Sequence, residues 1–387
     1  MHRNQLNFSG GPGALPDSVL VQLQQAVLEV PEVGLSILGI SHRSDWFKAL
    51  VQTTEQQIKQ LLGLNMGLGL GSSEKYHVLF LQGGATQQFS MLPMAFLQQA
   101  APSVDAHSAS FADYLVTGYW SQKAIADAQR QALDFQGRIN TLWDGQDGGY
   151  SRLPHTDELS FNPEAAYFHY VSNETVEGLQ QHQVLGLEGV PRVCDMSSDF
   201  LSRPIEAQRF DCIYAHAQKN LGPAGVTVVV MRDKMLQKAR NDAPGFLNYH
   251  TQVAAHSNYN TPPVFAIYVV HLVLRWLQED IGGLSAMGQI NQAKANALYE
   301  VIDASSGFYK GHAATRDRSM MNVCFRLHDA ELEARFLHQA TEAGFTGLAG
   351  HRSTGGLRAS LYNGVRLDAA QELAQFMREF QAQHQSR

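Results

Sequence analysis

One lysine stands between two apolar stretches in residues 214–231, YAHAQKNLGPAGVTVVVM. The flanks of Lys219 are short and rich in apolar or β-branched residues, which predicts two buried strands joined by a turn that contains Gly222 and Gly225. A lysine between buried strands loses hydration, so its pKa falls and its free amine becomes a nucleophile. Lys219 therefore has the properties that Schiff-base chemistry requires.

Two further polar groups follow predicted strands. The GGAT sequence at residues 83–86 comes after an apolar run and opens a predicted helix, so backbone N–H groups would converge on an anion such as a phosphate. Asp195 ends the apolar run at 189–196, at the edge where open parallel sheets bind ligands. An ordinary turn at 83–86 and a capping role for Asp195 are the structural alternatives.

Trp120 and Thr175 also follow predicted strands. Trp120 could lie on the face of a bound ring, and a place in the core is the alternative. Thr175 lies in the turn-forming SNETVEG sequence, where its hydroxyl could bind a ring oxygen or the backbone of its own turn. Both residues are therefore candidates for holding an aromatic cofactor.

Cationic residues indicate an anionic substrate. Arg358 lies beside two glycines, and its planar guanidinium suits a carboxylate, with a surface ion pair as the alternative. Two His-Arg pairs, His42 with Arg43 and His351 with Arg352, would together suit a dianion. Solvated positions are the default for such pairs, so each pair alone says little.

Short motifs that contain these residues follow one another along nearly the whole chain: NFSGGPG, SHR, GGAT, TGYW, SNETVEG, SSDFLSRPI, QKN with GPAG, NTPP, GHR and GGLRASLYN. Their types and order resemble the phosphoserine aminotransferases, a branch of the pyridoxal phosphate (PLP) enzymes of the aspartate-aminotransferase fold. The resemblance implies that Lys219 binds PLP and then acts as general base, and that Asp195 pairs with the ring nitrogen. Further cofactor contacts are implied for Ala85, Thr86, Trp120, Thr175, Gln218, Asn260 and Thr261.

The same resemblance implies the reaction. It is the reversible transamination of O-phospho-L-serine and 2-oxoglutarate to 3-phosphooxypyruvate and L-glutamate in serine biosynthesis. A role for 4-phosphohydroxy-L-threonine in pyridoxine biosynthesis stays open. Arg358 would bind the α-carboxylate, and His42, Arg43, His351 and Arg352 would bind the phosphate.

The resemblance further implies a homodimer with shared active sites. One His-Arg pair, together with Asn260 and Thr261, would reach the site from the second subunit. Thr86 departs from the pattern, because enterobacterial-type members have an arginine there. Part of the anion binding must then come from other residues.

The elements that would position these residues alternate between strand and helix. Apolar runs at 76–81, 111–117, 165–171, 189–196, 210–217 and 226–231 predict strands, with helices between several of them. This pattern indicates an α/β fold with a mostly parallel sheet, and the implied fold type I has seven strands and helices on both faces. Residues 17–284 are expected to form this large domain. Residues 1–16 and 285–387 are expected to form a smaller α+β domain.

Helices are also expected at 16–30, 41–62 and 290–303, and glycine-rich or polar insertions at 63–73 and 101–110 are expected at the surface. The longest apolar stretch, 264–277, is shorter than the roughly 20 residues that cross a bilayer. It reads as a buried helix. The first residues lack the apolar core of a signal peptide, so a cytoplasmic location is expected.

Composition narrows the alternatives. Only 17% of residues are charged and the net charge is -7, which disfavours nucleic acid and anionic membranes as partners. Cys194, Cys212 and Cys324 are widely spaced, so neither a disulfide framework nor a zinc site is expected, and no metal is assigned.

The alternative functions are those of an alanine-glyoxylate aminotransferase, a cysteine desulfurase-like enzyme, and a protein that keeps the fold without catalysis. The desulfurase would need a cysteine on a mobile loop.

Overall fold

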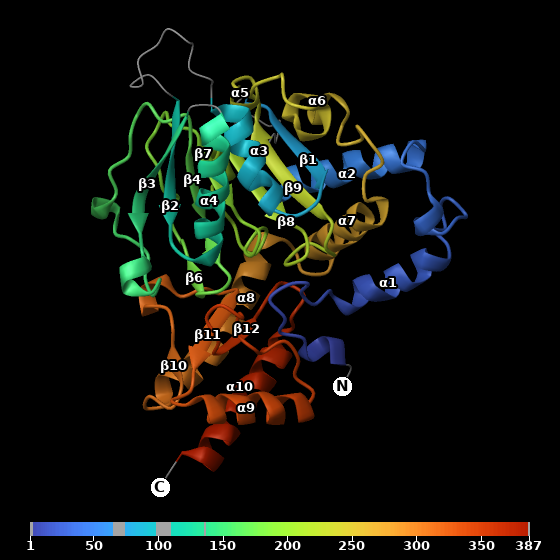
Figure 1. Ribbon diagram of the computed structural model, residues 1–387. Coiled ribbons are helices and arrows are strands. Elements are labelled where there is room, and N and C mark those ends of the chain that lie inside the picture. Colours follow the sequence, from blue (N-terminus) through green and yellow to red (C-terminus); the bar gives the residue numbers. More distant parts are fainter. Residues whose placement is uncertain (1–2, 65–73, 98–109, 135–136, 386–387) are drawn as a thin grey trace.

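The computed structural model describes residues 3–64, 74–97, 110–134 and 137–385. A large sheet with helices around it makes up most of the molecule, and a smaller part below it contains both chain ends (Figure 1). The insertions expected at 63–73 and 101–110 lie almost entirely outside the described residues.

Seven strands form the large sheet in the order β1, β9, β8, β7, β4, β2, β3 (Figure 1). β9 is antiparallel to both of its neighbours, and the other neighbouring strands are parallel. The prediction of an α/β fold with a mostly parallel seven-stranded sheet is therefore confirmed. The strands are β1 Tyr76–Gln82, β2 Phe111–Val116, β3 Arg138–Asp144, β4 Phe168–Val171, β7 Arg192–Asp195, β8 Cys212–His216 and β9 Val226–Arg232.

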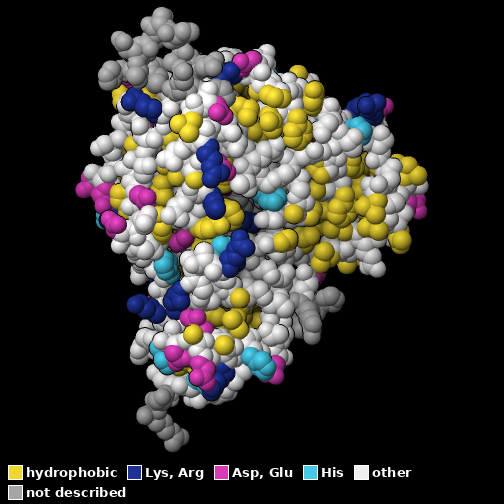
Figure 2. All heavy atoms as spheres, in the orientation of Figure 1, with side chains coloured by type: hydrophobic (Ala, Val, Ile, Leu, Met, Phe, Trp, Pro, Cys, Tyr) yellow, Lys and Arg dark blue, Asp and Glu magenta, His cyan; other side chains and the backbone are white. Residues whose placement is uncertain are grey.

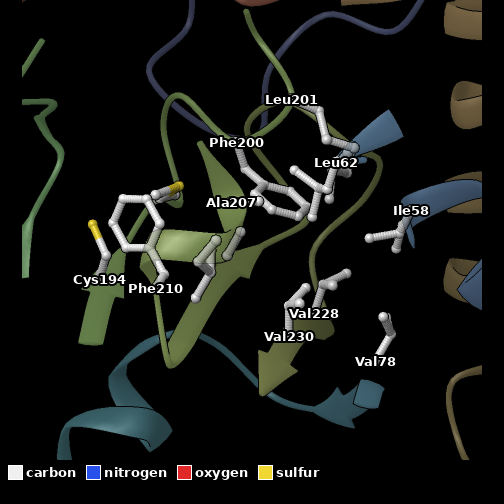
Figure 3. Close-up of a cluster of buried hydrophobic side chains, with 14 of the residues drawn as sticks. Ile58, Leu62, Val78, Cys194, Phe200, Leu201, Ala207, Phe210, Val228 and Val230 are labelled. Carbon is white, nitrogen blue, oxygen red and sulfur yellow. The ribbon is translucent and has the colours of Figure 1, made fainter. Parts of the chain in front are cut away.

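Helices cover both faces of this sheet. The helices of this part are α1 Asp17–Leu28, α2 Asp45–Leu61, α3 Thr86–Phe96, α4 Tyr119–Asp134, α5 Asp233–Leu236, α6 Tyr249–Ala254 and α7 Val264–Glu279. Because side chains alternate along a strand, Val78 and Phe80 of β1 pack with α2 and α7, whereas Leu79 and Leu81 pack with α3 and α4. Figure 3 shows part of the first cluster, with Ile58 of α2 on the same side as Val78.

Two helix starts differ from the prediction. α2 begins at Asp45 rather than at residue 41, because the Ser44 side chain caps it by accepting a hydrogen bond from the N–H of Phe47 at 3.2 Å. His42 and Arg43 therefore lie in the turn before the helix. Conversely, the helix expected from residue 290 begins at Leu284, directly after Gly283, whose φ is +94°. Among the described helices, none has both the length and the apolar character needed to cross a membrane.

The smaller part has a three-stranded antiparallel sheet in the order β10, β11, β12. Its core also includes Leu6 and Phe8, and Asn7 bridges to Thr346, so the N-terminal segment packs with the C-terminal elements. The predicted domain boundaries, after residues 16 and 284, stay predictions. The elements are α8 Leu284–Ala304, β10 Lys310–Gly311, β11 Asn322–Arg326, α9 Ala330–Glu342, β12 Leu357–Ser360 and α10 Leu367–His384.

Candidate active site

Lys219 lies in the turn between β8 and β9 and is only 9% exposed. Its Nζ donates a hydrogen bond to Thr175 Oγ1 at 2.6 Å and lies 5.3 Å from the centre of the Trp120 ring. Burial lowers the pKa of Lys219 to about 8, although the charge of Asp195 opposes this effect. The amine is therefore partly neutral near pH 8, as the sequence predicted for a lysine between buried strands.

A cavity of about 160 Å³ surrounds this amine. It is bounded by the start of α3, the first turn of α4, the ends of β4, β7 and β8, and the turn that carries the lysine. Six of the predicted residues line it together, namely Ala85, Thr86, Trp120, Asp195, Gln218 and Lys219.

One end of the cavity is suited to an anion. Gly83 has a φ of +100°, and its N–H and its carbonyl oxygen bind Gly225 and Thr227 at 3.1 and 3.0 Å, which ties the loop to β9. α3 then begins at Thr86, and the N–H groups at a helix start lack acceptors within the helix. The positive end of α3 and these N–H groups would hold a phosphate.

The cavity also contains a carboxylate. Asp195 is 4% exposed at the end of β7, and its Oδ1 accepts a hydrogen bond from the N–H of Ser197 at 2.8 Å. Burial raises the pKa of Asp195, while Ser197 and the charge of Lys219 act in the opposite direction. A cationic N–H group placed next to Asp195 would stabilise its charged carboxylate.

Trp120 forms part of the wall of this cavity. Its backbone N–H donates to Glu174 Oε2 at 3.1 Å, which holds the first turn of α4 in place. Its buried indole Nε1 has no hydrogen-bond partner within the described residues. An anion site, an acid, an aromatic side chain and a nucleophilic amine in one cavity fit a phosphorylated pyridine aldehyde.

Arg358 approaches from β12 in the smaller sheet. A Cβ atom added to Gly10 would lie 2.2 Å from Arg358 Nη2, so only glycine leaves room for this guanidinium. Arg358 contributes to the lowered pKa of Lys219, and its buried Nε has no hydrogen-bond partner within the described residues. The guanidinium is therefore positioned to bind a carboxylate beside the amine.

The other cationic candidates lie farther out. The His351 ring packs against the ring of Tyr119 with centroids 4.7 Å apart, and Arg352 beside it is exposed. Arg43 is exposed, and the carbonyl oxygen of His42 accepts a hydrogen bond from Asn258 at 2.9 Å. None of these four candidates lines the cavity around Lys219.

Asn260 and Thr261 lie beside Gln82, the last residue of β1. Asn260 Nδ2 donates to Gln82 Oε1 at 3.2 Å, and Gln82 Nε2 donates to the carbonyl oxygen of Thr261. Both residues are exposed and neither lines the cavity of its own chain. Their predicted contact with a cofactor stays a prediction.

Sequence reasoning missed several polar residues of the site. Ser197 and His216 line the cavity, and burial lowers the pKa of His216 to about 4, so this imidazole is neutral. Glu174 and Glu177 are buried behind Trp120. Both glutamates belong to the SNETVEG motif that contains Thr175, so the sequence placed them near the site. The motif does not show in which direction their side chains point.

Comparison with known proteins agrees with this geometry. The family model of class-V aminotransferases matches residues 5–373. The chain is 43% identical to the phosphoserine aminotransferase of Halalkalibacterium halodurans over 98% of each chain. The solved phosphoserine aminotransferase of Bacillus circulans subsp. alkalophilus superposes with a TM-score of 0.88 at 41% identity, covering 97% of this chain and 98% of that one. A PLP-bound phosphoserine aminotransferase from Trichomonas vaginalis gives 0.85 at 33% identity, with 96% and 99% covered.

Proposed function

The chain belongs to the class-V aminotransferases, and its full-length relatives are phosphoserine aminotransferases; we propose that it interconverts O-phospho-L-serine and 2-oxoglutarate with 3-phosphooxypyruvate and L-glutamate. Its cofactor is PLP. The observation that carries the proposal is the buried amine of Lys219, flanked by an anion site and by Asp195 in one cavity. The reaction belongs to serine biosynthesis, and a cytoplasmic location is part of the proposal.

Three groups hold the cofactor in this proposal. The loop before α3 would receive its phosphate, Asp195 would keep its ring nitrogen protonated, and Trp120 would offer an aromatic surface to the ring. Bound PLP supplies an electron sink for the bond that breaks at the substrate's α-carbon. Thr175 Oγ1, which accepts a hydrogen bond from Lys219 Nζ, would be available to a polar atom of the cofactor beside that amine.

Lys219 moves the proton. As a neutral amine, Lys219 Nζ would take the proton from the substrate's α-carbon and later give it up again. A pKa of about 8 suits both steps, because the amine is close to balanced between its two protonation states. Arg358 holds the α-carboxylate so that the α-proton faces this amine.

The far end of the substrate needs further cations. We infer that His351 and Arg352 bind the phosphate together with His42 and Arg43 of a second subunit, which also supplies Asn260 and Thr261. The same cationic pocket would accept the distal carboxylate of glutamate, so both substrates can use one site in turn.

An apolar surface supports this shared-site dimer. Val21, Leu28, Leu35 and Leu38 are each more than half exposed, and so is Tyr259. Leu38 precedes the His42 turn and Tyr259 precedes Asn260, so the apolar residues adjoin both segments assigned to the partner. Figure 2 shows hydrophobic side chains gathered over the area where Figure 1 places α1, α2 and α7. A second copy of the chain would cover this surface.

A desulfurase has less support. Cys194, Cys212 and Cys324 are all buried, and burial raises the pKa of Cys324 to about 12. A thiol of this kind is not a nucleophile.

The assay that tests the function compares amino donors. We expect the PLP-loaded protein to form glutamate from phosphoserine and 2-oxoglutarate, and its visible absorbance to change on addition of phosphoserine. Alanine with glyoxylate should give little of either signal, because alanine offers nothing to the distal cations. Preference for alanine would contradict the proposal.

A further inference from the structure

Two buried carboxylates meet behind Trp120, on the hairpin of β5 Asn173–Glu174 and β6 Leu179–Gln180. Glu174 is 1% exposed and Glu177 is 4% exposed. A Cβ atom added to Gly118 would lie 2.4 Å from Glu177 Oε2 and 2.8 Å from Glu174 Cδ, so both carboxyl groups flank the same glycine. Two negative charges this close in a buried site repel strongly, so one group holds a proton.

Hydrogen bonds decide which group is charged. Glu174 accepts from the N–H groups of Trp120 and Ser121 at 3.1 and 3.0 Å and from Ser121 Oγ at 2.6 Å. Glu177 accepts from the N–H of Tyr119 at 2.9 Å, while its buried Oε2 has no partner within the described residues. Donors stabilise a carboxylate, so the negative charge belongs to Glu174 and the proton to Glu177. Burial, reinforced by Glu174, raises the pKa of Glu177 to about 8.

Glu177 lies close to the arginine that binds the substrate. Glu177 and Arg358 line one cavity of about 220 Å³ between the hairpin and the smaller sheet. Arg358 is also close enough for its charge to oppose the rise in the pKa of Glu177. An ionised Glu177 would attract the guanidinium, whereas a protonated one leaves it uncommitted.

We propose that Glu177, kept protonated by Glu174, leaves Arg358 free for the substrate's α-carboxylate, and that loss of this proton makes Glu177 a competitor for Arg358. This inference rests on the proposed function. Glu177 is then a positioning residue that acts through Arg358. Its proton makes binding of carboxylate substrates dependent on pH.

Between pH 7 and 9.5 the Tyr150 hydroxyl and the Cys324 thiol, which line this cavity, stay protonated. Burial raises the pKa of Tyr150 well above its usual range and that of Cys324 to about 12. Arg326 and His312 also line the cavity, and Arg326 donates to the carbonyl oxygen of Thr354. Lys219 does titrate in this range in the free state, so the test uses PLP-loaded protein, in which the cofactor occupies this amine.

Binding of glutarate to the PLP-loaded protein, measured by calorimetry from pH 6.5 to 9.5, tests the inference. Glutarate has two carboxylates but no amino or keto group, so it binds without reacting. The wild-type Kd should be about tenfold higher at pH 9.5 than at pH 7, since one added charge beside Arg358 opposes binding. Glu177→Gln keeps an acceptor for Tyr119 but cannot ionise, so its Kd should stay flat. The exposed control Glu206→Gln should retain the wild-type slope.

The possible results distinguish a failure of this inference from a failure of the carboxylate site at Arg358. A wild-type Kd that does not change with pH, or an equal slope in Glu177→Gln, would overturn the inference and leave the proposed function intact. Failure of glutarate to bind at any pH would overturn the carboxylate site at Arg358 and the inference with it. Should the variant not fold, proton uptake on binding to the wild type at pH 9 decides, with about half a proton expected for a tenfold change in Kd. No uptake would refute the role of Glu177.

Discussion

At the scale of single residues, two buried lysines differ in their partners. Lys219 has one hydroxyl acceptor, Thr175, whereas Lys294 is 0% exposed and donates to the carbonyl oxygens of Leu361, Tyr362 and Val365 at 2.8, 2.9 and 2.9 Å. Three acceptors match the three donors of an ammonium group, so Lys294 is held in place. In the part of the chain that the structure describes, Lys219 Nζ has only this one hydrogen-bond acceptor, so its amine remains open to chemistry.

Cofactor uptake should therefore depend on pH. In the PLP-free protein we expect the rate of PLP incorporation, followed by absorbance, to rise with a midpoint near pH 8, because only the neutral amine of Lys219 reacts. Below that pH the ammonium form dominates. A midpoint near pH 10 would show that Lys219 is not desolvated.

Thr86 offers a second test at this scale. It is exposed and lines the cavity, at the position where the resemblance implies an arginine in enterobacterial-type members. Thr86→Arg should tighten phosphoserine binding by about two- to fivefold, as expected for one exposed charge pair. Thr86→Gln, whose side chain is long but uncharged, should leave phosphoserine binding unchanged. Equal effects of the two substitutions would show that the charge at position 86 does not strengthen binding.

At the scale of elements, much of the fold could be predicted because apolar runs identify buried strands. β3 was missed, since this edge strand is mostly exposed and RINTLWD has no clear alternation. The carboxylates of Glu174 and Glu177 were missed for another reason. Their role depends on the first turn of α4, which lies more than 50 residues away in the chain, and no local pattern reports that contact.

Lys294 of α8 is expected to stabilise the fold through its buried hydrogen bonds. Lys294→Met keeps the length of the side chain but leaves three buried carbonyl groups without their donor. We expect the free energy of unfolding to fall by roughly 3 kcal/mol or more, measured by urea denaturation. The exposed Lys238→Met is the matched control, and similar losses in both variants would contradict the assigned role.

At the scale of the whole molecule, distant segments meet around the lysine turn. The N–H of Gly13 donates to the carbonyl oxygen of Gln218 at 2.8 Å, and the N–H of Asn363 donates to Asn220 Oδ1 at 2.9 Å. Both ends of the chain therefore support the turn that carries Lys219. The motifs predicted which residues form the site, but not these contacts, because spacing in sequence does not determine packing across the two sheets.

Mixed dimers test whether the active sites are shared. Lys219→Ala and Arg43→Ala homodimers should each show strongly reduced phosphoserine turnover. After unfolding and refolding together, half of the dimers should be mixed, with one intact site each, which restores roughly a quarter of wild-type activity. Recovery no greater than the sum of the separate variants would place Arg43 outside the partner's site.

The central claim is that Lys219 carries the cofactor. Reduction of the PLP-loaded protein with borohydride fixes the carbon–nitrogen bond between them, and digestion with mass spectrometry then locates the label. The account predicts that the pyridoxyl group is found on the peptide that contains Lys219, and that Lys219→Ala yields no labelled peptide. A label on any other lysine, or no label on the wild type, would contradict it.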